Sequence, residues 1–241
     1  MQEHIEKHAI QSIPSTTRIE QFSDGVLSIV ITLLVFQIAL PEKDTILTWS
    51  SILKLVPTLT TFALSFFIIA VYWIKHHQLF HILHTSDRKL LWWNIHFLFW
   101  IALAPFASSL LGHHFFEIAA TAVYGFVMMS ISISFYILRY HATNKKSLHF
   151  QDIPRMKLRI ELRKLGFVSV IYIIGFGISF LAPIWATAIY FGTALLSIVK
   201  IPKTAIIFRG IDQSFISKAN AKSNSPAASE GLSIASGGKD Q

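Results

Sequence analysis

Apolar residues are gathered into six blocks along the chain, and short polar segments separate the blocks. Each block is close to the ~20 residues that a helix needs to cross a bilayer, and none shows the alternation of a barrel strand, which is about half as long. A helix also satisfies its own backbone polar groups in lipid. The pattern therefore predicts an all-α, polytopic membrane protein with six transmembrane helices. The predicted spans are 22–40, 52–74, 90–111, 116–138, 165–181 and 183–199.

Composition agrees with this class. The chain has 241 residues, of which 53% are hydrophobic and 14% are charged. A soluble domain carries about 25% charged residues. There are no cysteines, which excludes disulfides, thiolate metal ligands and cysteine nucleophiles. The residues before the first block are polar and hold no apolar core, so we expect no signal peptide.

The basic residues give the orientation. A net charge of +8 would suggest nucleic-acid binding in a soluble protein. Of the 21 Lys and Arg residues, however, all but Lys43 and Lys54 fall in segments that six spans place on one side. That side is cytoplasmic under the positive-inside rule. We therefore expect a multi-pass protein of the cell membrane, with both termini cytoplasmic, that contacts the lipid bilayer and no nucleic acid.

Segment boundaries follow from the same pattern. We expect a cytoplasmic N-terminal segment at 1–21, a six-helix transmembrane domain at 22–209 and a disordered cytoplasmic tail at 210–241, which is poor in apolar residues. Pro57 lies near the start of the second span, where proline is tolerated. Pro105 lies inside the third span and should kink it.

A basic, amphipathic stretch at 157–164 precedes the fifth span. The simpler interpretation is a cytosolic extension of that helix. Contact with lipid headgroups is the alternative, because basic residues beside a membrane attract anionic lipids.

The first span carries the most informative residues. On a helix with about 100° per residue, Asp24, Ser28 and Thr32 fall in one row, with Ile29 in the adjacent row. Hydroxyls in membrane helices often bond back to their own helix or across a helix interface. The alternative is that this face lines an ion path, because hydroxyls replace part of a cation's water shell and bulky aliphatic rings gate by dewetting.

The start of this span carries a specific sequence motif. Arg18, Phe22, Ser23 and Asp24 form the pattern R-x-x-x-F-S-D before an apolar helix. It resembles the signature of the transmembrane protein 175 family of endosomal and lysosomal potassium channels, in its short prokaryotic form. The resemblance implies that 22–209 is a channel domain. It also implies that the protein is a modestly selective potassium channel and not an enzyme, a homotetramer with the first helix around a central pore.

The resemblance also implies roles for individual residues. The apolar constriction falls on Ile29, Leu33 and Phe36, although an aliphatic residue is usual at the third position. Ser28 and Thr32 fall on the hydroxyl positions near the constriction. The signature residues imply a structural network that fixes the first helix, with direct ion contact at Asp24 as the alternative. That network would comprise Arg18, Phe22, Ser23, Asp24, His77, Trp93 and Asn94.

Two other functions are weighed against a channel. A secondary transporter or proton-coupled carrier is one alternative, but we find neither the paired repeats nor the midplane polar groups that transporters usually have. A metal-dependent membrane enzyme is the other, suggested by eleven histidines. The groups at 76–84 and 113–114 fall on opposite sides by the charge distribution, so we expect no metal, no cofactor and no catalytic residue. The group at 76–84 could instead sense pH.

Overall fold

The computed structural model describes residues 15–38, 48–145, 148 and 155–197. The chain divides into two compact units, Met1–Ile198 and Val199–Gln241, and every described residue belongs to the first. The predicted disordered tail and most of the predicted N-terminal segment lie outside the described residues.

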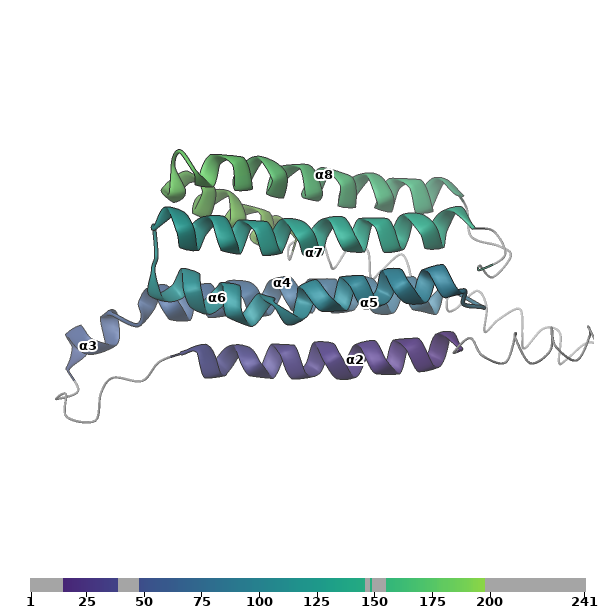
Figure 1. Ribbon diagram of the computed structural model, residues 1–241, viewed down its shortest axis with the longest axis horizontal. Coiled ribbons are helices and arrows are strands. Elements are labelled where there is room, and N and C mark those ends of the chain that lie inside the picture. The colour runs from purple at the N-terminus through teal and green to yellow at the C-terminus, as the bar shows by residue number, and fades with distance from the viewer. Residues whose placement is uncertain (1–14, 39–47, 146–147, 149–154, 198–241) are drawn as a thin grey trace, which may run out of the picture. The chain divides into compact units, whose positions relative to one another are not determined.

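Helices make up nearly all of the described part of the chain (Figure 1). Five helical segments in it are long and apolar enough to cross a membrane, and one shorter apolar helix follows them. The elements are α2 (Thr16–Leu33) with the 3-10 turn η1 (Leu34–Gln37), α3 (Trp49–Leu53), α4 (Val56–His81), α5 (Arg88–Ala102), α6 (Ala104–His113), α7 (Ile118–Asn144), α8 (Arg155–Ser179) and the helix Pro183–Ser197.

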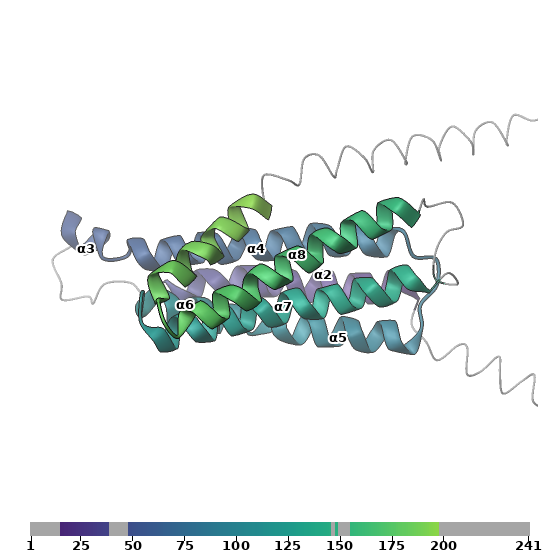
Figure 2. The same cartoon turned by 90° about the horizontal axis from the view of Figure 1, so that it is seen from above.

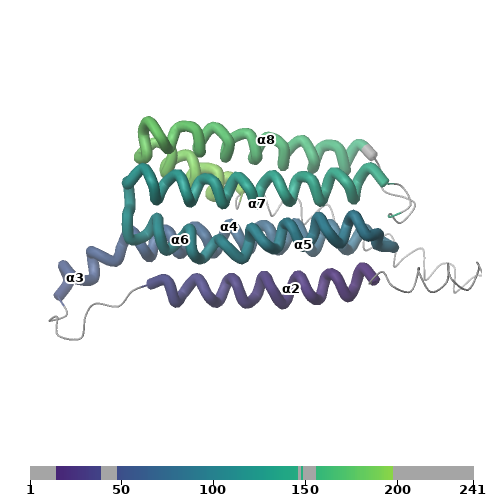
Figure 3. The backbone as a smooth tube through the Cα atoms, in the orientation of Figure 1, coloured from purple at the N-terminus to yellow at the C-terminus, as the bar shows by residue number. Residues whose placement is uncertain are grey.

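Local sequence explains where the helices begin and break. Ser15 caps α2 by accepting a bond from the Arg18 backbone N–H, so the helix starts six residues before the apolar block. Pro57 lies in the first turn of α4, where its missing N–H costs nothing. Pro105 interrupts the third span as expected: α5 ends at Ala102 and α6 starts two residues later along almost the same line (Figure 3).

Several helices extend beyond the apolar blocks that predicted them. Helix α4 continues to His81, so His76 and His77 lie on a helix face and not in a loop. Helix α7 continues to Asn144. Helix α8 starts at Arg155, so the basic stretch at 157–164 is part of that helix. Hydrogen bonding continues along a helix after the apolar residues end, which hydropathy alone does not register.

The helices pack in layers within this unit. On one side of α4, α5 and α6 lies α2, and on the other side lies α7, with α8 against the outer face of α7 (Figure 1). The turned view shows the helix Pro183–Ser197 folding back after α8 (Figure 2). Aromatic side chains fill the centre, where Tyr72, Phe97 and Phe135 contact one another with ring centroids 5.1 to 6.0 Å apart.

The last helix docks through Tyr190. Its buried ring contacts the rings of Tyr124 and Tyr172, at 5.7 and 6.1 Å between centroids. It fits because Gly125 and Gly175 leave space on α7 and α8. A Cβ at Gly175 would lie 2.6 Å from Cε1 of Tyr190, and a Cβ at Gly125 would lie 2.6 Å from Cζ.

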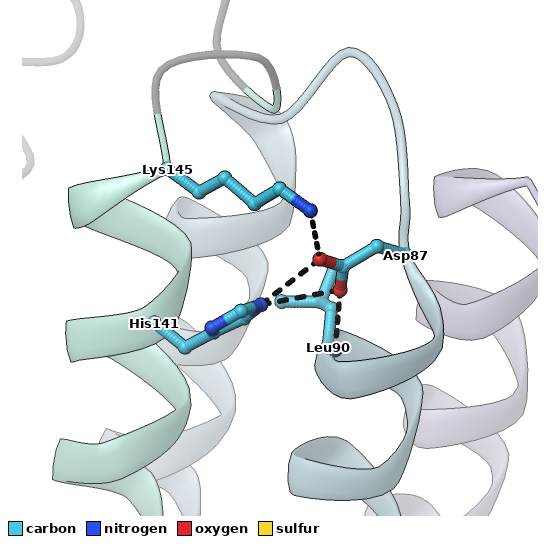
Figure 4. A network of polar contacts seen from close by, with 4 residues as sticks. All are labelled: Asp87, Leu90, His141 and Lys145. Atoms are coloured by element: carbon cyan, nitrogen blue, oxygen red, sulfur yellow. Dashed lines mark hydrogen bonds and ion pairs between the residues drawn. The ribbon is translucent and has the colours of Figure 1, made fainter.

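Asp87 ties the start of α5 to the end of α7 (Figure 4). Its carboxylate caps α5 by accepting from the Leu90 backbone N–H at 2.6 Å, and it also accepts from Lys145 Nζ at 2.7 Å and His141 Nε2 at 3.1 Å. Burial alone would raise the pKa of Asp87. The bonds from Lys145, the Leu90 backbone and His141 outweigh burial and hold that pKa below its ordinary value.

Candidate functional site

The first helix has one face turned into the protein. The residues of this face recur at helical spacing and are the buried ones of α2: Ile19, Ser23, Leu27 and Val30, followed by Leu34 in η1. They pack against α4, α5 and α6. Spacing of three or four residues puts such side chains in one stripe, so burial of this stripe fixes the rotation of α2 about its axis.

The other face of α2 is uncovered by the described part of the chain. Ile29 is 60% exposed, Leu33 43% and Phe36 79%, and Ser28 and Thr32 are also exposed. Gly25, one turn before Ile29, is also exposed, and a Cβ there would meet no atom within 4 Å. The residues singled out in the sequence as pore-lining thus share one exposed face, while their role at a constriction remains a prediction.

The two hydroxyls on this face differ in one respect. Thr32 donates its proton to the Ile29 carbonyl oxygen at 2.8 Å, which leaves its lone pairs directed outward. A hydroxyl held in this way presents oxygen and no proton to a nearby cation. Ser28 makes no side-chain bond to any described residue, so its hydroxyl can turn in either direction.

A buried chain of hydrogen bonds joins three helices at the start of α2. Asn94 of α5 donates to Ser23 Oγ at 2.8 Å, and its carbonyl oxygen lies 2.8 Å from His76 Nε2 on α4. Because that oxygen is an acceptor, Nε2 of His76 carries the proton. All three side chains are fully buried. Ser23 also donates to the Ile19 carbonyl oxygen, so its hydroxyl both donates and accepts a hydrogen bond.

Two more bonds lie outside this buried chain. Trp73 Nε1 donates to Asp24 Oδ1 at 2.9 Å, and His77 Nδ1 lies 2.8 Å from Glu20 Oε1. The later residue of α2, Asp24, pairs with the earlier residue of α4, Trp73, as expected for antiparallel helices. We call the whole set the helix-start network. It comprises Glu20, Ser23, Asp24, Trp73, His76, His77 and Asn94.

The structure places the other signature residues outside this network. Arg18 is exposed and makes no ion pair with a described residue, and Phe22 is 59% exposed. Trp93 contacts the ring of His96 on its own helix. The partner of Asp24 is therefore Trp73, which was not among the predicted site residues.

Glu20 and His76 were not among the predicted site residues. A signal for His76 did exist. It stands three residues after Trp73 and one before His77, so these three residues occupy adjacent turns of one helix face. The sequence could not show that this face meets α2. In the described segments, no three His, Asp or Glu side chains come together as a possible metal site.

These features define the class of the protein. The chain is an integral membrane protein of apolar helices. Buried polar bonds fix one side of α2, and the described residues leave its other side uncovered. A family model described as the endosomal/lysosomal potassium channel TMEM175 matches residues 18–105. That range includes the whole helix-start network.

Relatives over most of the chain agree. A protein of Chryseobacterium sp. (strain P1-3), named as a potassium channel, is 31% identical over 183 residues, which cover 76% of this chain and 92% of the relative. A Chamaesiphon minutus protein of the same description is 33% identical over 189 residues, covering 73% and 93%. The chain therefore belongs to the TMEM175 family.

A solved structure gives the same result for the fold. It is the crystal structure of a homologue of the lysosomal potassium-selective channel TMEM175 from Chamaesiphon minutus. The TM-score is 0.69 at 30% sequence identity, and the match covers 77% of this chain and 97% of that one.

Proposed function

We propose that this protein is a potassium channel in which four copies surround a central pore lined by the exposed face of α2. The observation that carries the proposal is the mixed chemistry of this face. Exposed apolar residues alone would suit lipid. The hydroxyls of Ser28 and Thr32 on the same uncovered face suit a cation path instead.

The spacing of this face supports a layered constriction. At 1.5 Å per residue, Ile29, Leu33 and Phe36 rise over about 10 Å of the helix axis. Four copies of each would form three apolar rings, with the hydroxyls one position before the first two rings. Potassium would lose part of its water at the rings, and the smaller, more tightly hydrated sodium ion would lose it less readily.

A single chain cannot enclose such a path, because α2 presents only one face. Closed rotational symmetry is the usual form of a homo-oligomer. We propose a homotetramer of six-span subunits in the cell membrane, with the helix Pro183–Ser197 as the sixth span and both termini cytoplasmic. The helix-start network would hold the pore face in place.

Ion flux tests the channel itself. Protein reconstituted in liposomes should carry current whose reversal potential follows the potassium gradient more closely than the sodium gradient. Ile29→Asn should raise the conductance, because a polar ring wets more easily. Ile173→Asn is the matched control, since Ile173 is 46% exposed on α8, away from the proposed pore. Absence of current in every gradient, or saturating flux coupled to protons, would reject a channel.

The absence of cysteine makes assembly and topology directly testable. Leu33→Cys should cross-link between copies under oxidation, and Ile173→Cys should not. Asn144→Cys should react with an impermeant maleimide only from the cytoplasmic side, and Lys54→Cys only from the other side. Cross-linking at Ile173 alone, or labelling of both sites from one side, would contradict the arrangement.

A further inference from the structure

A buried arginine near the end of α7 has no direct hydrogen-bond or ion-pair partner among the described residues. Arg139 is 2% exposed, and its Nε atom is buried with no hydrogen-bond partner in the described part of the chain. No carboxylate of the described residues lies within ion-pair distance of its guanidinium. A buried charge that has no counter-ion is costly, and removing one member of a buried pair usually destabilises a protein by several kcal/mol. Glu161 is the carboxylate of the described residues whose charge acts on this guanidinium, and it makes its ion pair with Lys164 instead, so Arg139 has no direct anionic partner among the described residues.

Packing along α7, together with the effect of the Glu161 charge on Arg139, indicates which helix Arg139 faces. Ser132 lies seven residues earlier, on the same face, and bonds to Ser169 of α8 at 2.8 Å. Tyr136 lies between them and faces Gly166, whose added Cβ would lie 3.4 Å from the tyrosine ring. Because α7 and α8 run antiparallel here, the next turn places Arg139 against the first turns of α8. His141, two residues on, is turned instead toward Asp87.

Other charges surround this position. Lys75 of α4 lies over the ring of Tyr72, 5.9 Å from its centroid, and it interacts electrostatically with Arg139, Glu161 and Lys164. Glu161 is already bound to Lys164 Nζ at 2.6 Å. Among the described residues here, three cations therefore share one carboxylate. The excess is two positive charges, and an added anion would relieve the repulsion between Lys75 and Arg139.

We propose that Arg139, Lys75 and Lys164 form a binding site for a phosphate group, supplied by the headgroup of an anionic lipid in the cytoplasmic leaflet. A guanidinium is the side chain best suited to bind phosphate through two parallel bonds, and the lysines add point charges. The site lies at the ends of α4 and α7 and the start of α8, where the basic residues accumulate. Basic pockets between helices on that side of a membrane attract lipid headgroups.

Binding to purified protein tests this inference independently of channel activity. The full chain, delipidated in dodecyl maltoside, is titrated with dioctanoyl phosphatidylglycerol, dioctanoyl phosphatidylcholine or inorganic phosphate, with native mass spectrometry and thermal unfolding as readouts. Phosphatidylglycerol should bind and raise the unfolding temperature. Phosphatidylcholine should bind less, because its choline group cancels the phosphate charge.

Arg139→Gln should weaken phosphatidylglycerol binding by at least about tenfold, the loss expected for one charge-assisted hydrogen bond. Arg163→Gln is the matched control: it removes the same charge from the exposed side of α8 and should bind as the wild type does. If Arg139→Gln does not fold, Lys75→Gln gives the same comparison at a less buried position.

Equal binding by Arg139→Gln, Lys75→Gln and the wild type would overturn the site. Stabilisation by inorganic phosphate that depends on Arg139, without any by phosphatidylglycerol, would overturn the lipid assignment. Stabilisation by both probes that depends on Arg139 would support recognition of the phosphate group itself.

Discussion

Replacing Asn94 with leucine removes the central group of the buried chain from Ser23 to His76. Ser23 keeps its bond to the Ile19 carbonyl oxygen and loses only a donor at its oxygen. His76 loses more. Its Nδ1 atom already has no partner among the described residues, and Asn94→Leu would leave Nε2 without one as well.

The magnitude follows from these two losses. An unsatisfied buried donor costs about 1–3 kcal/mol. A side-chain hydrogen bond between membrane helices is worth about 0.6 kcal/mol on average. Asn94→Leu should therefore destabilise the protein by about 2–3 kcal/mol, most of it from His76.

A second substitution should restore most of this loss. The ring of His76 lies between Phe80 and Phe97, at 4.4 and 5.9 Å between centroids, so phenylalanine suits its surroundings. The double variant Asn94→Leu/His76→Phe has no orphaned ring nitrogen, and apolar replacement of both partners of a hydrogen bond can be nearly neutral. It should recover about 1–3 kcal/mol relative to Asn94→Leu alone.

Unfolding by SDS in dodecyl maltoside micelles, followed by tryptophan fluorescence, measures the four members of this cycle. His76→Phe alone should be less destabilising than Asn94→Leu, because it leaves only the Asn94 carbonyl unpaired and removes an orphan atom. A double variant that is less stable than either single variant would refute the reasoning, since the two losses would then be independent.

Two further predictions concern packing and pH. Gly125→Ala should destabilise the protein by about 1–3 kcal/mol, because the new methyl group overlaps Tyr190. Gly177→Ala is the control: its methyl group meets no atom within 4 Å, so it should be neutral or slightly stabilising in the same unfolding assay. Equal effects of the two substitutions would contradict the close packing at Gly125. The lowered pKa of Asp87 means that its charge stabilises the fold above the unfolded value of about 3.9, and this contribution is lost as the pH falls through the folded pKa. Wild type should therefore exceed Asp87→Asn in stability at pH 7, with the difference closing below about pH 4; a difference that persists there would show that the charge is not its source.

Much of this protein could be predicted from local sequence. Each apolar block had to become a helix, because lipid offers no hydrogen-bond partners to the backbone. Pro105 had to break the third span, since proline lacks the amide hydrogen that a helix interior needs. The stripe of Ser28, Ile29, Thr32 and Leu33 also follows from periodicity, because 3.6 residues per turn fixes which side chains share a face.

The exact ends of the helices were harder to predict from the sequence. Serine and aspartate caps at Ser15 and Asp87 set where α2 and α5 begin, and polar residues extended α4 and α7 past the edge of the apolar blocks. Hydropathy reports partition into lipid, and a helix does not need to end where the lipid does.

Which residues meet across helices was decided only by the tertiary structure. The sequence marked Asp24 and His77 for one network, but their bonded partners are Trp73 and Glu20, because the register between α2 and α4 sets which turns lie side by side. No spacing in a single chain encodes that register. The sequence determined the helices and the exposed face of α2. Packing of α2 onto α4 and α5 decided which residues make contact, because a shift of one helix by less than a turn changes every pair across the interface.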